Sequence, residues 1–168
     1  MSTAPIFRKA EKKDIATIQQ IAAATWPVAY AEILSSRQVH YMMNMMYSQP
    51  VLRSQMQQPY SYFYLLEEEN GKPAGFFHIS ATDDEGKWKL HKIYLHPAQH
   101  GKKYGKMMLQ EAMKKAKENG ATSLDLQVNR DNNAQHFYQK NGFRITDTGD
   151  FAIGAGFYMN DYVMSRLL

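Results

Sequence analysis

The sequence predicts an α/β fold: a mixed, twisted sheet of about seven strands with helices on both of its faces. Three observations indicate this fold. Helical and strand periodicities interleave along the chain, which is typical of a sheet covered by helices. A strand, a strong helix and another strand follow one another over residues 88–128, which predicts one parallel strand pair. The chain has 168 residues and neither a linker nor a repeat, so residues 1–168 are expected to form a single domain.

The chain is expected to begin with a short strand and a helix. Residues 5–10 are the strand, and Asp14 is expected to cap the helix that follows it. Pro27 disfavours helical geometry at the residue before it, so this helix is expected to end at Trp26. The apolar residues of the helix recur at helical spacing: Ile15, Ile18, Ala22 and Thr25.

Two more helices are expected before the central strands. Ser35 and Gln38 form a capping box for the first of them, and residues 51–57 are the second. The apolar face of the first fits the spacing of an amphipathic helix and is rich in methionine, which favours a core stripe over a binding groove. This face consists of Val39, Met42, Met43, Met46 and Tyr47.

The strands follow in two groups. An Asn-Gly pair at residues 70–71 is the strongest hairpin signal in the chain and joins strands at 61–69 and 72–80. A third strand covers 88–97. The C-terminal half is then expected to contain a helix at 103–119 that stops at Gly120, a strand at 123–128, a short helix at 132–141 and a closing hairpin of 143–153 with 157–168.

Composition excludes several classes of protein. Hydrophobic residues make up 44% and charged residues 21%, as in ordinary globular proteins. No apolar run approaches the roughly 18 residues that span a bilayer, so no membrane association is expected. The start of the chain lacks the apolar region of a secretory signal, which leaves the cytoplasm as the expected compartment. The absence of cysteine excludes disulfides, thiolate metal sites and cysteine nucleophiles.

The net charge of +4 raises the question of a nucleic-acid partner. Basic residues concentrate between 87 and 117, but this stretch lacks the interleaved exposed aromatics of nucleic-acid surfaces, so no nucleic acid is expected to bind. The alternatives are a solvated helix face or a local site for a polyanionic ligand. The six histidines lack a tight ligand spacing with a carboxylate nearby, so no metal site is expected.

A loop at residues 100–106 stands between a strand and a strong helix. Its glycines allow backbone N–H groups to approach a ligand, and the helix N-terminus adds positive potential, so the loop is a candidate seat for a pyrophosphate. A tight connection between elements is the alternative. The spacing of the glycines and Met107 after Lys106 do not fit a Walker P-loop, which argues against nucleotide hydrolysis.

Two runs of the sequence resemble motifs of the GNAT superfamily of N-acetyltransferases. LHKIYLHPAQHGKKYGKMMLQEAM resembles the first core motif, and VNRDNNAQHFYQKNGF resembles the second. Together they cover roughly residues 75–145. The ending FYMNDYVMSRLL and the length are similar to a bacterial branch that includes polyamine acetyltransferases. The resemblance implies an enzyme that transfers acetyl from acetyl-CoA to an amine by direct attack on the thioester.

The resemblance also implies where coenzyme A binds. The backbone of Ile93, Tyr94 and Leu95 would bond the pantetheine arm, and Asn132 would touch it. The pyrophosphate would be held by the loop residues His100, Gly101, Lys102, Lys103, Tyr104, Gly105 and Lys106. His100 stands where relatives have Gln or Arg, and Lys103 stands where they have glycine. A helical conformation is expected at Lys103.

The general acid implied by the resemblance is Tyr138. A phenol with a pKa of about 10 is protonated at neutral pH and can supply the proton that the departing thiolate needs. The alternative is a buried aromatic beside Phe137. Backbone N–H groups at a splay between strands 88–95 and 123–128 would stabilise the developing oxyanion.

The candidate base is His91, which occupies the place where relatives often carry a glutamate. A histidine can accept a proton directly or through water, with a pKa near 6–7. Strand alternation places His91 with Ile93 and Leu95 on one face. The other face is expected to contain Leu90, Lys92 and Tyr94. A structural histidine is the alternative, and His78 is a weaker candidate base.

The amine acceptor is expected in a cleft walled by residues 26–32. Trp26 and Tyr30 would receive an alkyl chain, and Glu32 a second cation. A small polyamine-like molecule is the first hypothesis for the partner. Acetylation of a peptide or protein amine, and a regulatory module that binds coenzyme A without turnover, are the alternatives. A homodimer is left open.

Overall fold

The computed structural model describes residues 5–168. Seven strands form one sheet in the order β1-β2-β3-β4-β5-β7-β6, which confirms the predicted α/β architecture. The parallel pair is β4 with β5, and the other five neighbouring pairs are antiparallel. The strands are β1 (Ile6–Lys9), β2 (Ser61–Glu67), β3 (Pro73–Ala81), β4 (Lys87–Leu95), β5 (Ser123–Asn129), β6 (Arg144–Gly154) and β7 (Phe157–Leu167).

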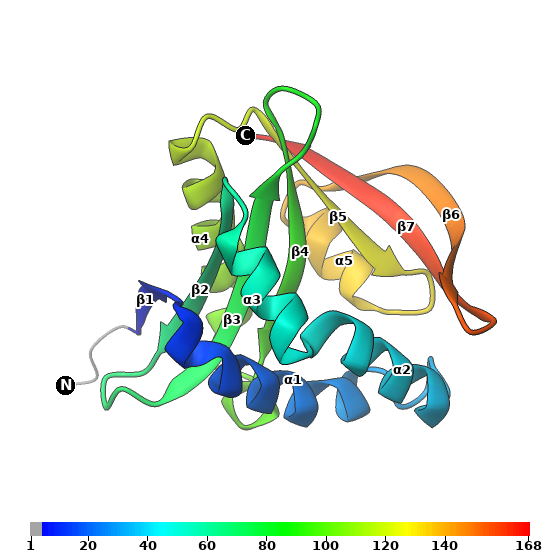
Figure 1. Cartoon of the computed structure of the whole chain (residues 1–168). Coiled ribbons are helices and arrows are strands. Elements are labelled where there is room, and N and C mark those ends of the chain that lie inside the picture. Colours follow the sequence, from blue (N-terminus) through cyan, green and yellow to red (C-terminus); the bar gives the residue numbers. More distant parts are fainter. Residues whose placement is uncertain (1–4) are drawn as a thin grey trace.

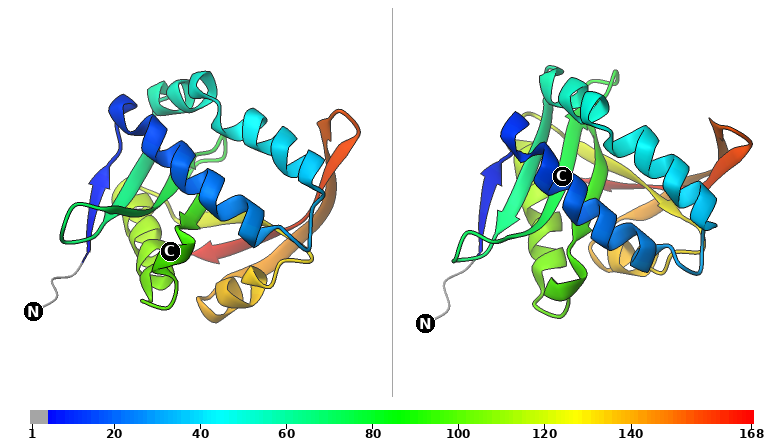
Figure 2. Two further views of the ribbon diagram at one scale, coloured as in Figure 1. Left: turned by 90° about the horizontal axis from the view of Figure 1, so that it is seen from below. Right: turned by 60° about the horizontal axis from the view of Figure 1, so that its bottom comes forward.

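Helices cover both faces of the sheet (Figure 1). The helical elements are η1 (Lys12–Asp14), α1 (Ile15–Ala29), α2 (Ser36–Tyr47), α3 (Gln49–Gln57), η2 (Pro97–Gln99), α4 (Tyr104–Glu118) and α5 (Ala134–Lys140). The views in Figure 2 place α1, α2 and α3 on one face and α4 and α5 on the other. Each face buries its own apolar cluster, so the sheet is a central layer between two cores.

The first helix does not end at Trp26, and this prediction was wrong. Helix α1 continues through Pro27 to Ala29. Trp26 is 1% exposed, and its ring lies 4.7 Å from the ring of Tyr30 and 5.7 Å from that of Tyr94. This aromatic packing holds Trp26 in helical geometry and overrides the local preference of the residue before a proline.

Asp14 precedes α1 as expected, but it does not cap that helix. Its carboxylate accepts bonds from the Arg8 guanidinium at 2.9 and 3.0 Å and from the backbone N–H of Glu11 at 2.8 Å. Asp14 therefore closes the short turn η1 and ties it to β1. The predicted capping box of Ser35 and Gln38 is confirmed for one of its two hydrogen bonds. Ser35 Oγ accepts a bond from the Gln38 backbone N–H at 3.1 Å.

A bulge in β4 changes which residues share a face. His78 pairs with Lys92 and Ile79 pairs with Leu90, so His91 is an extra residue without a partner in β3. Leu90 belongs to the core on the α4 side, whereas Lys92 lies under α3 and contacts Gln55. The prediction that Leu90, Lys92 and Tyr94 share a face was therefore wrong, because a bulge shifts the alternation by one residue.

The parallel pair opens part of the way along the sheet. Pairing between β4 and β5 runs from Lys87 with Ser123 to Leu90 with Leu126. Beyond that point β4 remains paired with β3, and β5 remains paired with β7 as far as Asn129 with Asp161. The predicted splay between the two strands is therefore present, and backbone groups of β4 on this side are released from the ladder.

Candidate active site

Two cavities meet at the splay between β4 and β5. We call the one under α1, α2 and α3 the first cavity, and the one that runs toward α4 and α5 the second cavity. The β4 bulge and the end of the parallel pairing lie at their junction. The residues that line both cavities are Tyr30, Leu90, His91, Lys92, Tyr94 and Gln127. A reaction between two ligands, one in each cavity, would take place at this junction.

All four residues predicted for the pantetheine arm line the second cavity. Ile93, Tyr94 and Leu95 of β4 line one wall, and Asn132 and Tyr138 line the opposite one. The Asn132 side-chain oxygen accepts a bond from the backbone N–H of Ala134 at 2.9 Å, so it also fixes the first turn of α5.

The loop at 100–106 forms a separate open hollow at the N-terminus of α4. Its lining includes Gly101, Lys103, Tyr104, Gly105 and Lys106. His100 lines both this hollow and the second cavity. The hollow and the second cavity are therefore contiguous, as one extended ligand requires.

Lys103 does not adopt the predicted helical conformation. Its φ is +62°, in the left-handed region, and Gly101 also has a positive φ of +87°. Helix α4 therefore begins one residue later, at Tyr104. A glycine adopts the left-handed conformation freely, whereas a lysine adopts it at some cost in strain. The cationic side chain remains beside the hollow.

Lys102 has another partner. Its ammonium donates to Gln99 Oε1 at 2.7 Å and lies 3.5 Å from Glu68. The predicted role of Lys102 at the pyrophosphate would require it to leave these contacts, so Lys103 and Lys106 are the cations that the loop presents directly.

Tyr138 lies on α5 at the wall of the second cavity. Its ring packs against Phe137 and Phe143, with centroids 5.4 and 6.0 Å away. Burial, and to a lesser degree the nearby phenol of Tyr30, raise the pKa of Tyr138. The phenol therefore keeps its proton at neutral pH, as a proton donor must.

The two histidines lie in a stack between β3 and β4. The ring of His78 lies 4.0 Å from that of Phe63 and 4.6 Å from that of His91. His78 is buried with Nε2 2.8 Å from Ser61 Oγ, which favours a structural role. His91 Nε2 lies 2.6 Å from Ser80 Oγ, and this ring lines both cavities.

The surroundings of His91 weaken it as a base. His91 is exposed, yet desolvation by the surrounding protein, followed by the charges of Lys89 and Lys92, lowers its pKa to about 3. A group with such a pKa is neutral throughout the physiological range but has little affinity for a proton.

The first cavity has a volume of about 200 Å³, the size of a small molecule. The predicted acceptor residues Trp26 and Tyr30 line it, and the Tyr30 hydroxyl lies 3.0 Å from that of Tyr94. Glu32 is exposed and does not line the cavity. The carboxylate found there is that of Asp161, on β7.

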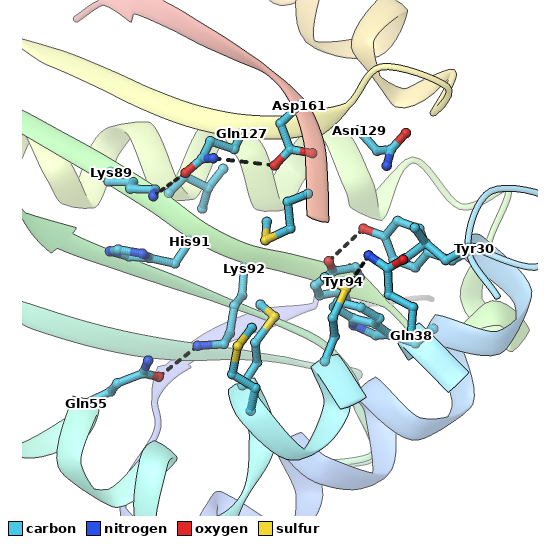
Figure 3. Close-up of a pocket in the computed structure, with 17 residues that line it drawn as sticks. Tyr30, Gln38, Gln55, Lys89, His91, Lys92, Tyr94, Gln127, Asn129 and Asp161 are labelled. Atoms are coloured by element: carbon cyan, nitrogen blue, oxygen red, sulfur yellow. Dashed lines mark hydrogen bonds between the residues drawn. The ribbon is translucent and has the colours of Figure 1, made fainter. Parts of the chain in front are cut away.

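Three charged residues of the first cavity were missed by sequence reasoning (Figure 3). Lys89 donates to Gln127 Oε1 at 2.6 Å, and Gln127 Nε2 donates to Asp161 Oδ2 at 3.4 Å. Lys92 donates to Gln55 Oε1 at 2.8 Å. One signal was available: Lys92 and Asp161 are charged residues inside predicted strands, and charged residues are seldom fully buried unless they are paired.

Burial moves the pKa of all three of these groups, and it lowers that of Lys89. It raises the pKa of Asp161 to about 6, although Arg130, Lys89 and Gln127 lower it in part. It also lowers the pKa of Lys92 to about 7. Lys92 and Asp161 are each 3% exposed. Perturbed groups that share one cavity are typical of a functional site.

The residues present fit coenzyme A. The second cavity offers unpaired backbone groups of β4 to an extended arm, and the hollow at the N-terminus of α4 offers N–H groups and two lysines to a pyrophosphate. In the part of the chain that the structure describes, no group of three or more His, Cys, Asp or Glu side chains could hold a metal ion. No helix of residues 5–168 is long and apolar enough to cross a membrane.

Comparison with known proteins agrees with this geometry. Residues 17–143 match the acetyltransferase (GNAT) family. The chain therefore belongs to the acetyltransferase (GNAT) family, as the two sequence motifs indicated. It is an N-acetyltransferase, and acetyl-CoA is the acetyl donor of this family.

Individual relatives cover most of the chain. Spermidine N(1)-acetyltransferase from Thermoplasma acidophilum is 30% identical over 146 residues, which are 84% of this chain and 89% of the relative. An uncharacterized N-acetyltransferase of Mycobacterium tuberculosis is 36% identical over 105 residues, 62% of this chain and 66% of that protein. Among solved structures, the PaiA N-acetyltransferase from Thermoplasma acidophilum in complex with coenzyme A superposes with a TM-score of 0.84 at 27% identity, covering 99% of this chain and all of that one.

Proposed function

We propose that this N-acetyltransferase acetylates a primary amine of a small molecule that enters the first cavity, while acetyl-CoA occupies the second. The observation that carries this proposal is the junction of the two cavities at the splay of β4 and β5. An amine in one cavity and a thioester in the other would meet there in line for direct attack, which avoids a covalent enzyme intermediate.

Three parts of the chain bind the donor, acetyl-CoA, in this proposal. Gly105 and Lys106 at the start of α4 hold the pyrophosphate with backbone N–H groups and positive charge. The β4 backbone at residues 93–95 bonds the pantetheine arm as a further strand would, and Asn132 flanks it. When bound, acetyl-CoA supplies a thioester carbonyl whose oxygen gains charge during attack, and free N–H groups at the splay stabilise that charge.

Tyr138 completes the transfer as the general acid. Tyr138 lines the cavity that would contain the leaving sulfur, and its phenol is protonated at neutral pH. Donation of this proton lets coenzyme A leave as a thiol rather than as a thiolate.

The proton lost by the amine is assigned to Asp161. The predicted base, His91, stands at the junction but has a pKa of about 3, so it binds a proton too weakly for this role. Asp161 is the carboxylate of the first cavity, and its pKa of about 6 leaves it ionised and moderately basic at neutral pH. It can hold the incoming ammonium and take up its proton directly or through water.

Polyamines are one acceptor class in keeping with the name of the spermidine-acetylating relative. The apolar rings of Trp26 and Tyr30 could bind an alkyl chain. A peptide amine is the alternative from sequence, and the small volume of the first cavity favours a free small molecule over a chain that must continue outward.

Steady-state assays test the proposed activity. The protein is incubated with acetyl-CoA and a panel of small amines and peptides while free thiol is followed, and products are identified by mass spectrometry. Acetylated small amines are the expected result. Thiol release with peptides alone would favour a protein acceptor. Acetyl-CoA binding by calorimetry without thiol release would instead favour the non-catalytic module.

A further inference from the structure

The first cavity contains charged groups of both signs without an ion-pair partner among the described residues; of these groups, Lys92 and Asp161 are buried and Lys89 is half-buried. Lys89, Lys92 and Asp161 all line it, and none of them takes part in an ion pair among the described residues. Charges removed from water are costly unless they are paired. Such an arrangement is expected where a ligand supplies the missing partners.

Lys92 has the least compensation of the three. It is 3% exposed, and its ammonium receives one hydrogen bond acceptor, Gln55 Oε1. The rings of Tyr47 and Phe63 lie 5.5 and 5.3 Å from its Nζ. Cation–π contacts of this kind offset part of the desolvation but do not neutralise the charge. An ammonium carries three N–H donors, and Gln55 accepts from one of them. The donors on the side of the cavity therefore lack a hydrogen-bond acceptor within the described part of the chain.

Lys89 and Asp161 lie on the same side of the cavity but do not contact each other. Gln127 stands between them and contacts both, accepting from Lys89 at 2.6 Å and donating to Asp161 at 3.4 Å. Arg130, the other cation that acts on Asp161, is bonded to Asp150 on β6. Figure 3 shows Lys89 and Asp161 on either side of Gln127, and Lys92, from the same strand as Lys89, pointing toward Gln55 and the helices.

From this distribution we infer that the natural acceptor is an amino-acid-type molecule, a primary amine that also carries a carboxylate, with the positive charges of Lys92 and Lys89 attracting the carboxylate and Asp161 holding the amine. This inference rests on the proposed function and names its substrate class. The two lysines supply charge-assisted donors for a carboxylate. Asp161 supplies the acceptor for an ammonium at the open end of the splay, opposite Asn129.

A polyamine fits these charges poorly. A second protonated amine would find no second carboxylate among the described residues of the lining, and it would be repelled by Lys89 and by the protonated fraction of Lys92, whose pKa is about 7. The apolar walls accept an alkyl chain in either case, so it is charge, and not shape, that discriminates between the two classes.

The test compares amino acids with the amines that their decarboxylation leaves, for example lysine with 1,5-diaminopentane, and includes spermidine. The measured quantity is the selectivity ratio, kcat/KM for the acid divided by kcat/KM for the matched amine. We expect a ratio of about 10 to 100 for the wild type, the effect of one or two charged hydrogen bonds. Lys92→Met and Lys89→Met should each lower the ratio toward one.

Both variants should fold, because they replace a charge that has lost its water with an apolar chain of similar length. Lys114→Met is the matched control: Lys114 is an exposed lysine on α4 outside both cavities and should keep the wild-type ratio. A ratio at or below one, a preference for spermidine, or a ratio unchanged in both cavity variants overturns the inference while leaving the transferase activity standing. Absence of thiol release with every acceptor overturns the proposed function as well.

Discussion

Tyr138 is the residue on which the proposed chemical step depends most directly. Tyr138→Phe removes one hydroxyl and preserves the packing of the ring against Phe137 and Phe143. General acid catalysis contributes about 10²- to 10⁴-fold, so we expect kcat to fall within that range. KM for acetyl-CoA should change little, because the hydroxyl acts on charge that develops in the transition state.

Assays of the initial rate with the preferred amine measure kcat and KM for the Tyr138→Phe enzyme, and Tyr64→Phe is the control. Tyr64 is a half-buried tyrosine of β2 that lines neither cavity. A Tyr138→Phe enzyme with wild-type kcat would refute the general-acid role.

The pH dependence distinguishes Asp161 from His91 as the proton acceptor. The active form of Asp161 is the carboxylate, whose fraction rises with pH through a pKa of about 6. We therefore expect the ratio of wild-type to Asp161→Asn kcat/KM to rise through about pH 6 and level off above it. Taking this ratio cancels the ionisation of the amine itself, which is the same for both enzymes.

The same ratio for His91→Ala should be flat between pH 5 and pH 9, since the pKa of His91 is about 3. A His91→Ala ratio that rises through pH 6–7, combined with a flat one for Asp161→Asn, would return the role of base to His91.

The candidate site residues that the sequence predicted differ in kind from those that only the structure brings to the site. Tyr138, Asn132 and Gly105 lie in contiguous motifs, so their neighbours in sequence identify them. Asp161 reaches the site because β7 pairs with β5, and its partner residues lie far away in the chain. Only the strand order brings it beside Lys89, which no local pattern encodes.

At the scale of elements, two local rules were overridden by packing. Pro27 failed to end α1, because aromatic contacts around Trp26 hold the helix in place. The bulge at His91 in β4 breaks the period-2 pattern that the strand's own sequence suggests. The bulge places Lys92 under α3 and His91 at the junction, so the departure from the regular pattern is also what builds the site.

The N-terminus of α4 should bind the most negative part of the donor. A side chain at Gly105 would enter open space, because no heavy atom lies within 4 Å of an added Cβ. Gly105→Glu should therefore fold normally, and an acid in the first turn suits the helix dipole. Beside a pyrophosphate, however, like charges cost several kcal/mol, so we expect affinity for acetyl-CoA to fall about 100-fold or more.

Calorimetric titration of acetyl-CoA measures this affinity. Gly105→Gln, similar in size but uncharged, separates the effect of charge from that of bulk and should lose less. Unchanged affinity in Gly105→Glu would show that the pyrophosphate binds elsewhere.

At the scale of the whole molecule, the two cavities are assembled from different parts of the chain. The second cavity depends on β4, β5 and α5, which the sequence motifs cover. The first cavity is closed by a contact between α2 and the hairpin of β6 and β7, whose ends approach each other in both views of Figure 2. Tyr41 donates to the Ile153 carbonyl at 2.6 Å, and the Gln38 amide donates to the Tyr158 carbonyl at 2.7 Å. These pairs are 112 and 120 residues apart, which explains why the sequence predicted both elements but not their contact.

This closure should affect the acceptor without affecting the donor. Tyr41→Phe removes the bond to Ile153 and keeps the ring on Phe157, 5.2 Å away between centroids. The hairpin carries Asp161 and Met159 into the first cavity, so loosening it should raise KM for the amine by about 2- to 10-fold, the effect of one hydrogen bond. The calorimetric Kd for acetyl-CoA should stay the same, because the second cavity does not touch this contact. Tyr60→Phe, at a tyrosine that is 61% exposed, is the control and should match the wild type in both measurements. If KM for the amine and Kd for acetyl-CoA changed equally, or if neither changed, the hairpin and α2 would not define a separate acceptor site.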